Sequence, residues 1–290
     1  MLDYLDVLAD LHETRRPRTY LEVGIFRGDS LRLVREDTFC VGVDPEPILT
    51  PGDERHCHIE RTTSDAFFAG PRPRELFGGR PVDMVFIDGM HLFEHALRDF
   101  LNAEAMASSE SLILLHDCLP QDALTSSRDR TTAHWTGDVW KVVVCLLDHR
   151  PDLELSIVDV PPAGLCLVSC LNPRDQTLRN SFDALVDQYL HMGFEAWEAR
   201  LADVLRRTAG TPDAQLWSLR KEIAVLHDRL AEREAQTAAE IAGLHDRLAE
   251  RESQTAAVEE QLRSVYTSTS WRFSAPIRRV GALLRRRSGA

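Results

Sequence analysis

The sequence predicts an α/β fold in which five parallel strands and an antiparallel edge hairpin form one sheet, followed by a long C-terminal helix. Short apolar runs recur as far as Leu171, and the first five are separated by segments long enough for helices. Such alternation is typical of parallel strands with crossover helices. Only Pro161, Pro162 and Ala163 separate the last two runs, and so short a link forces an antiparallel pair.

The strand predictions rest on runs rich in Val, Ile, Leu and Phe between polar or turn residues. The predicted strands are residues 19–25, 39–44, 57–62, 82–88, 111–116, 153–160 and 164–171. Residues 175–208 predict one or two helices broken near Gly193, and residues 210–212 form a short linker.

A long helix is predicted from residue 215 to about residue 265. It contains the near-identical repeats Leu226-His-Asp-Arg-Leu-Ala-Glu-Arg-Glu and Leu244-His-Asp-Arg-Leu-Ala-Glu-Arg-Glu, 18 residues apart. This period is about five helical turns, so apolar residues stay on one face. The stripe consists of Leu219, Ile223, Leu226, Leu230, Ile241, Leu244, Leu248, Val258, Leu262 and Val265. It predicts a coiled coil and a homo-oligomer; a single charged helix is the alternative.

Charge is unevenly distributed along the 290 residues, whose net charge is −12. Six arginines and no acid follow residue 269, so the rest carries 28 basic and 46 acidic residues, a net charge of −18. So acidic a body excludes a nucleic-acid-binding protein. Trp271, Phe273 and Ile277 alternate with arginines in the tail, which predicts docking on an anionic membrane surface or on another protein. A disordered basic tail is the alternative.

Targeting features predict a cytoplasmic protein, with the tail able to bring it to the inner face of the membrane. No run of about 18 apolar residues is present, and the first residues lack the basic start of a secretory signal. The cysteines at positions 40, 57, 118, 145, 166 and 170 contain no Cys-x-x-Cys pair. This pattern predicts reduced, buried thiols.

A glycine turn and an acidic strand end indicate a nucleotide-type cofactor. Residues 20–30 read Tyr-Leu-Glu-Val-Gly-Ile-Phe-Arg-Gly-Asp-Ser, a buried strand, a glycine turn and a helix start, and the next strand ends at Asp44. Glycines let the backbone approach a ligand, and a carboxylate at the next strand end accepts ribose hydroxyls. The spacing Glu-x-Gly-x-x-x-Gly differs from the dinucleotide pattern, so we expect S-adenosylmethionine. A plain tight turn is the alternative.

Four polar side chains follow the fourth and fifth predicted strands: Asp88, His91, His116 and Asp117. The carboxyl ends of parallel strands face one crevice, so these side chains should converge beside the cofactor. Two carboxylates and a histidine suit a divalent cation, Mg²⁺ or Mn²⁺, and a second histidine suits a base. Helix capping by Asp88 and structural roles for the histidines are the alternatives. Residues 119–136 are polar and Arg-rich, which predicts a lid over the substrate or a long loop.

Together these motifs resemble the class I S-adenosylmethionine-dependent methyltransferases, with their Rossmann-like sheet. Phe86-Ile87-Asp88-Gly89-Met90-His91 is similar to the Phe-Ile-Asp-Gly-x-His signature of a branch that includes macrolide-sugar and surface-glycan O-methyltransferases. The resemblance implies a metal at Asp88, His116 and Asp117, and His91 as the base. His116 departs from the branch, in which an acidic residue is expected, and a histidine suits Mn²⁺ better than Mg²⁺.

The resemblance also implies which residues surround S-adenosylmethionine. Asp44 would hold the ribose and Asp65 would lie near the adenine. The full expected set is Glu22, Gly24, Phe26, Gly28, Ser30, Asp44, Asp65 and Asp88.

The tail has a resemblance of its own. Ser268, Ser270, Trp271 and Arg272, followed by Pro276 and Arg278, are similar to C-terminal segments of bacterial surface-polysaccharide enzymes. We therefore expect a methyltransferase domain (1–172), a helical extension (173–209), a coiled-coil helix (210–266) and a basic amphipathic tail (267–290). The expected activity is O-methylation of a sugar hydroxyl on a surface glycan or glycosylated metabolite. A non-catalytic scaffold and a different enzyme on the same fold are the alternatives.

Overall fold

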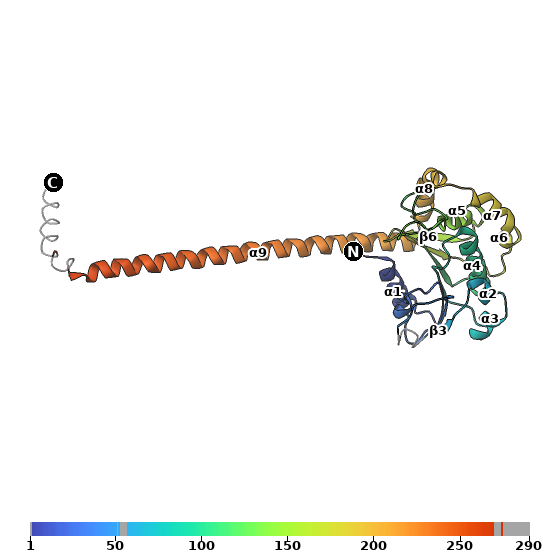
Figure 1. Ribbon diagram of the computed structural model, residues 1–290, viewed down its shortest axis with the longest axis horizontal. Helices are drawn as coiled ribbons and strands as arrows, with labels where there is room; N and C mark the ends of the chain where they lie inside the picture. The colour runs from blue at the N-terminus through green and yellow to red at the C-terminus, as the bar shows by residue number, and fades with distance from the viewer. Residues whose placement is uncertain (1, 51, 53–56, 270–273, 275–290) are drawn as a thin grey trace. The chain divides into compact units, whose positions relative to one another are not determined.

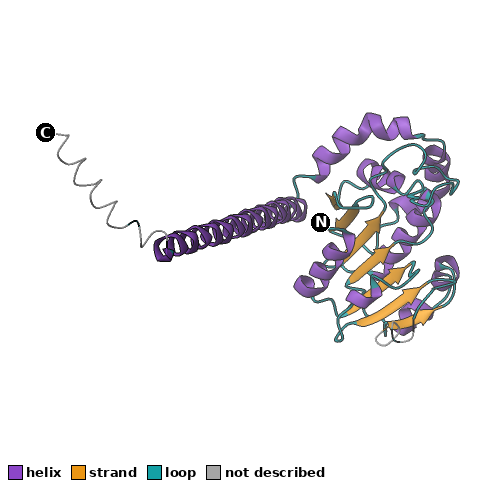
Figure 2. Cartoon of the chain, turned by 60° about the vertical axis from the view of Figure 1, so that its left-hand side comes forward, coloured by secondary structure: helices purple, strands orange, loops and turns teal. Residues whose placement is uncertain are grey.

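The computed structural model describes residues 2–50, 52, 57–269 and 274, and it divides the chain into two compact units, residues 1–224 and 225–290. Within the described residues the first unit contains a seven-stranded sheet (Figures 1 and 2). Its strands are β1 (Thr19–Val23), β2 (Phe39–Val43), β3 (Cys57–Glu60), β4 (Met84–Ile87), β5 (Leu112–His116), β6 (Glu154–Val158) and β7 (Leu165–Ser169).

The strand order is β3-β2-β1-β4-β5-β7-β6. The first five strands pair in parallel, and β7 pairs antiparallel with both β5 and β6. This arrangement confirms the predicted Rossmann-like sheet with its antiparallel edge hairpin. The order reverses between β1 and β4, and ligands of open parallel sheets bind where the order reverses, at the carboxyl ends of the strands.

Alternating side chains of the strands form the two halves of the core. On β5, Leu112 and Leu114 belong to one cluster and Ile113 and Leu115 to the other, because successive strand residues point to opposite faces. Helices cover both faces of the sheet (Figure 2). They are α1 (Tyr4–Arg15), α2 (Ser64–Phe68), α3 (Arg72–Leu76), α4 (Phe93–Met106), α5 (Trp140–His149), α6 (Thr177–Asn180), α7 (Phe182–Leu190) and α8 (Phe194–Thr208).

The connection from β1 to β2 differs from the prediction. A helix start was expected after Gly28, but this segment holds only a 3-10 turn, η1 (Leu31–Leu33). Ser30 makes no side-chain bond to the backbone of this turn, because its hydroxyl donates instead to Glu22. The described residues between β2 and β3 contain no helix either. The first crossover is therefore a short irregular loop rather than a helix.

The cysteine prediction was wrong for one pair. Cys40 and Cys57 form a disulfide. Cys118, Cys145 and Cys166 are buried free thiols, as expected, whereas Cys170 is a free thiol but exposed. Cys40 and Cys57 are directly paired in the register of β2 and β3, with their Cα atoms 4.5 Å apart. A sequence separation of 17 residues gives no sign of this pairing.

The helical extension belongs to the first unit, where Leu185, Tyr189, Trp197 and Val204 enter the core. The break near Gly193 is confirmed, since α8 begins directly after it. The last described helix, α9 (Pro212–Thr267), contains the boundary between the two units. None of the described helices is long and apolar enough to cross a bilayer. Apart from Ser274, the predicted tail from residue 270 onward lies outside the described residues.

Candidate active site

The glycine turn after β1 brings the end of β1 against the end of β4. Gly24 has a φ of +88°, and a Cβ atom there would lie 2.1 Å from the carbonyl oxygen of Asp88. Any larger residue would push the two strand ends apart. Gly28 has a φ of +72° and donates its N–H to Ile25 at 2.9 Å, which closes the turn.

Glu22 and Ser30 lie beneath this turn. Glu22 is fully buried, and it accepts hydrogen bonds from the Ser30 hydroxyl at 2.6 Å and the Tyr20 hydroxyl at 2.8 Å. Burial raises the pKa of Glu22 to about 8, although both hydrogen bonds favour the charged form. Both carboxylate oxygens are therefore used inside the protein, where they brace the turn.

Asp44 holds the same turn from the end of β2. Its Oδ2 accepts the N–H groups of Ile25 and Phe26 at 2.8 and 3.0 Å, and its Oδ1 accepts the N–H of Glu46 at 2.8 Å. Phe26 has a φ of +48° and a side chain that is 59% exposed. The predicted cofactor residues of β1 and β2 are thus joined by direct hydrogen bonds.

Asp65 lies apart from this turn, on α2. Its carboxylate accepts two hydrogen bonds of 3.1 Å from Arg98 of α4. The two residues border a separate cavity of about 320 Å³. The expected position of Asp65 beside an adenine stays a prediction.

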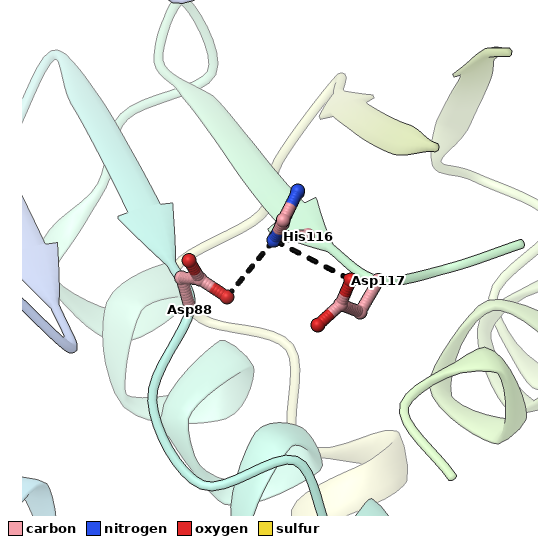
Figure 3. Close-up of side chains that lie close together, drawn as sticks. All are labelled: Asp88, His116 and Asp117. Atoms are coloured by element: carbon pink, nitrogen blue, oxygen red, sulfur yellow. Dashed lines mark hydrogen bonds and ion pairs between the residues drawn. The ribbon is translucent and has the colours of Figure 1, made fainter. Parts of the chain in front are cut away.

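The four strand-end residues converge, as predicted. Nδ1 of His116 lies 3.0 Å from Oδ1 of Asp88 and 3.6 Å from Oδ1 of Asp117 (Figure 3). Nε2 of His91 lies 3.3 Å from Asp88, and its Nδ1 lies 3.0 Å from Asp117. Two carboxylates and two imidazoles therefore form one cluster at the carboxyl ends of β4 and β5.

The charges in this cluster shift one another. Burial favours the neutral form of Asp88, but His116 and His91 hold the pKa of its carboxyl below the usual range. Burial likewise opposes charge on His91, yet Asp88 and Asp117 raise the pKa of this imidazole to about 9. Burial raises the pKa of Asp117. The two carboxylates therefore favour the charged form of His91.

Three of the four residues could hold a cation. One ligand atom each from Asp88, His116 and Asp117 lie within 4.8 Å of one another. Two carboxylate oxygens and an imidazole nitrogen are a donor set that Mn²⁺ and related divalent cations accept. The side chains present therefore fit such an ion, and its ligands would come from two neighbouring strand ends.

Two aromatic rings pack against His116, and sequence reasoning missed one of them, Tyr4. The ring of Tyr4, in the first turn of α1, lies 4.2 Å from the ring of His116, and Phe86 lies 6.0 Å from it. As a result His116 is only 6% exposed, and among the described residues its Nε2 has no hydrogen-bond partner. No sequence motif marks Tyr4, because α1 precedes the predicted sheet and carries no signature.

A cavity of about 180 Å³ opens above the cluster. Part of its wall comes from residues 121–136, so the segment predicted as a lid or a long loop borders the site. The ring of Trp135 stacks on His91 at 5.3 Å and an interplanar angle of 14°, and its carbonyl oxygen lies 2.9 Å from Nδ1 of His91. The remaining wall residues are Gln121, Thr125, Arg130, Ala133, His134, Thr136, Pro162 and Ala163.

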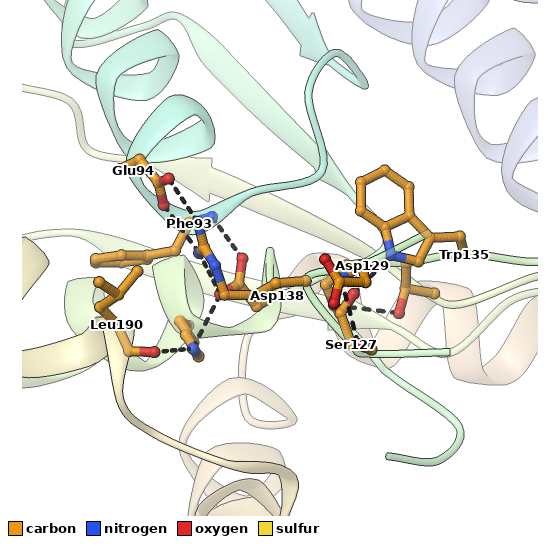
Figure 4. A network of polar contacts seen from close by, with 11 residues as sticks. Phe93, Glu94, Ser127, Asp129, Trp135, Asp138 and Leu190 are labelled. Atoms are coloured by element: carbon orange, nitrogen blue, oxygen red, sulfur yellow. Dashed lines mark hydrogen bonds and ion pairs between the residues drawn. The ribbon is translucent and has the colours of Figure 1, made fainter. Parts of the chain in front are cut away.

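Polar contacts attach this loop to the site (Figure 4). Arg128 donates to both oxygens of Glu94 on α4, at 2.6 and 3.0 Å, and to Asp138 at 2.8 Å. Asp138 in turn accepts the N–H of Phe93 at 2.7 Å. At Gly137 the loop crosses the backbone of His91, where a Cβ atom would lie 1.7 Å from the His91 carbonyl oxygen. The loop is therefore anchored to the segment that carries His91.

The segment that carries this site is similar to a known protein family. Residues 21–118 match a family model described as a methyltransferase domain. This segment runs from β1 to the end of β5 and includes every predicted site residue. No curated protein matches the chain.

Several solved methyltransferase structures resemble the chain in part. The O-methyltransferase TomG of Streptomyces achromogenes is 19% identical, over 57% of this chain and 78% of that one, with a TM-score of 0.43. The Podospora anserina methyltransferase PaMTH1 is 14% identical, over 57% and 76%, with a TM-score of 0.41. An O-methyltransferase of Bacillus cereus is 12% identical, over 56% and 78%, with a TM-score of 0.40. The segment that matches the methyltransferase model therefore coincides with the five parallel strands of the Rossmann-like sheet.

Proposed function

We propose that the protein is an S-adenosylmethionine-dependent O-methyltransferase, assisted by a divalent cation, that acts on a sugar hydroxyl of a bacterial surface glycan or glycosylated metabolite. The observation that carries the proposal is the cluster of Asp88, His91, His116 and Asp117 beside the glycine turn of a methyltransferase-type domain. The choice of a sugar as the acceptor rests only on the resemblance of the signature around Asp88.

The proposed chemistry is transfer of a methyl group to a hydroxyl oxygen. When bound, S-adenosylmethionine supplies an electrophilic methyl group, and a cation held by Asp88, His116 and Asp117 would lower the pKa of the acceptor hydroxyl. Because Asp88 and His91 lie within 3.3 Å of each other, a hydroxyl at this point can be oriented and deprotonated by one set of side chains.

His91 has the role of the base in this proposal. Asp88 and Asp117 orient its ring through contacts of 3.3 and 3.0 Å, and Trp135 stacks on it. The raised pKa of His91, about 9, means that a proton must leave the imidazole before it can accept another. Asp88 and Asp117 have the second role of stabilising the charged imidazole after it has taken the proton of the acceptor.

Proposed partners follow from the second unit and the tail. Stripe residues such as Leu226 (60%) and Leu244 (55%) are exposed on α9. A second copy of the helix would bury them, which supports a homo-oligomer. We further propose that the arginine-rich tail docks on the inner face of the membrane or on a polysaccharide-biosynthesis protein. A purely structural scaffold would use the same helix, but it would not need the clustered histidines and carboxylates.

Calorimetric titration of the full-length protein with S-adenosylmethionine, with Mn²⁺, with Mg²⁺ and without metal, tests the cofactor. We expect micromolar binding that Asp44→Ala abolishes, because Asp44 holds the glycine turn. The matched control is Glu46→Ala, which removes the same charge from an exposed residue two positions away. This variant should bind S-adenosylmethionine as the wild type does. No binding under any condition would refute the methyltransferase proposal.

Methyl transfer itself requires a second assay. Transfer from labelled S-adenosylmethionine to sugars and glycans should be lost in Asp88→Asn. Stimulation by Mn²⁺ that disappears in His116→Ala would support the cation. If turnover stays the same after all divalent cations are removed by a chelator, the proposed role of the cation is refuted, but the methyltransferase activity is not.

A further inference from the structure

The cavity is lined by two sets of residues that differ in chemical character. Asp88, His91, His116 and Asp117 form the strand-end cluster, and the loop contributes Gln121, Thr125, Arg130, His134 and Trp135. Arg130 is the one arginine or lysine among the cavity-lining residues. An acceptor whose hydroxyl reaches the cluster therefore shares the cavity with a guanidinium.

Arg130 differs from its neighbour Arg128. Arg128 forms ion pairs with Glu94 and Asp138, so its charge is already paired within the protein. For Arg130 no ion pair or hydrogen bond is recorded within the described part of the chain; its recorded contact is with the ring of Trp135, 5.9 Å from the guanidinium carbon. Its five N–H donors are thus available to a ligand.

Trp135 gives Arg130 a fixed neighbour. The indole Nε1–H donates to the carbonyl of Ser127 at 2.6 Å, and the ring is stacked on His91. A guanidinium near such a ring is attracted to its face, at a distance close to the limit of about 6 Å for this interaction. Arg130 is thereby connected through one aromatic ring to the residue proposed as the base.

We infer that Arg130 forms an anion subsite and that the acceptor carries a carboxylate or phosphate group as well as the hydroxyl that is methylated. This inference rests on the proposed function and narrows its substrate class to acidic sugars, either uronates or sugar phosphates. The planar fork of arginine matches both groups with two parallel hydrogen bonds. His134 lines the same cavity as Arg130.

Paired probes test the subsite in the full-length protein saturated with S-adenosylhomocysteine and Mn²⁺. Glucuronic acid is compared with glucuronamide, and glucose 1-phosphate with methyl glucoside, by calorimetry. The first pair reports a carboxylate and the second a phosphate. The variants are Arg130→Gln, Arg130→Lys and, as a matched control, Arg174→Gln, which removes an exposed arginine that does not line the cavity.

We expect the wild type and Arg174→Gln to bind at least one anionic probe about tenfold or more tightly than its neutral partner, as a bidentate charged contact requires. Arg130→Gln should bring the ratio close to one, and Arg130→Lys should retain part of it, with S-adenosylhomocysteine affinity unchanged throughout. The pair that shows the preference identifies the anion.

Three results would overturn the subsite while leaving the methyltransferase in place: equal binding of each anionic probe and its neutral partner, no binding of either anionic probe, or an acid preference that survives in Arg130→Gln. Failure of S-adenosylhomocysteine to bind would instead overturn the proposed function on which the subsite rests.

Discussion

The ring of Tyr4 lies 4.2 Å from the imidazole of His116, centroid to centroid, and shields it on the side of α1. The first turn of α1 is set by a capping box, in which Asp3 accepts the N–H of Asp6 at 3.2 Å and Asp6 accepts that of Asp3 at 2.8 Å. A helix that precedes the sheet in sequence thus controls how much water reaches the strand-end cluster.

Tyr4→Ala should destabilise the protein and loosen the cluster. Loss of a partly buried ring costs about 1–3 kcal/mol of unfolding free energy, below the 3–5 kcal/mol typical of fully buried aromatics. The same change should weaken Mn²⁺ binding, because His116 becomes exposed. Urea unfolding and metal titration measure the two effects. Tyr4→Phe should behave like the wild type, since no hydrogen bond from the hydroxyl is recorded among the described residues; a defect as large in Tyr4→Phe would contradict a packing role.

Glu22→Gln should change how stability depends on pH. Burial raises the pKa of Glu22 from its ordinary 4.5 to about 8, so between these values the folded protein holds a proton that the unfolded chain has released. Wild-type stability should therefore fall as pH rises through this window, by about 1.4 kcal/mol for each unit of pKa difference. The glutamine variant lacks this loss.

The measurement compares unfolding free energies of the two proteins at pH 5 and pH 8.5. The variant should gain stability relative to the wild type at the higher pH, whereas the exposed Glu36→Gln should follow the wild type. A constant difference between Glu22→Gln and the wild type would argue against a proton on Glu22. A large loss of S-adenosylmethionine affinity would favour its alternative role at the cofactor.

Gly137→Ala should displace His91. The glycine has a φ of +55°, and the added Cβ would lie 1.7 Å from the carbonyl oxygen of His91. We expect faster proteolysis of the loop, a loss of stability of a few kcal/mol, and lower methyl transfer. Gly243 of α9 has no atom within 4 Å of such a Cβ; Gly243→Ala should therefore stabilise the helix by about 1 kcal/mol. Wild-type activity in Gly137→Ala would show that the loop can move without harm.

Light scattering tests the association of α9. We expect the wild type to exceed the mass of one chain, 32.8 kDa, and the double variant Leu226→Asp and Leu244→Asp to approach it. Both leucines belong to the exposed apolar stripe, and a charge there opposes a coiled-coil seam. The control Ala239→Asp introduces the same residue, aspartate, at a position outside the stripe. It should not change the mass. A wild type that runs as a single chain would contradict the homo-oligomer.

Much of the sheet could be predicted because it depends on local patterns. Continuous apolar runs such as 111–116 indicate strands buried on both faces, and the short link at Pro161–Pro162 sets the hairpin. The convergence of Asp88 and Asp117 follows from parallel strands alone.

Other features depend on contacts between distant residues, which a single sequence does not show. The Ser30 hydroxyl bonds Glu22 instead of beginning a helix, and Cys40 meets Cys57 only because β2 and β3 are in register. Tyr4 and Trp135 reach the cluster from segments with no motif. Asp44 was predicted to bind ribose, but its hydrogen bonds to the glycine turn are visible only in three dimensions.

The anchoring of the loop by Arg128 has a consequence for attempts to redesign this protein. Arg128, Trp135 and Gly137 connect the cavity wall to His91, so exchanging the whole loop for one from another protein would also displace His91, the proposed base. Point changes at Gln121, Thr125 and Ala133 reshape the wall but leave that framework intact. A mutant library restricted to these three positions is the design most suited to altering acceptor choice without loss of turnover.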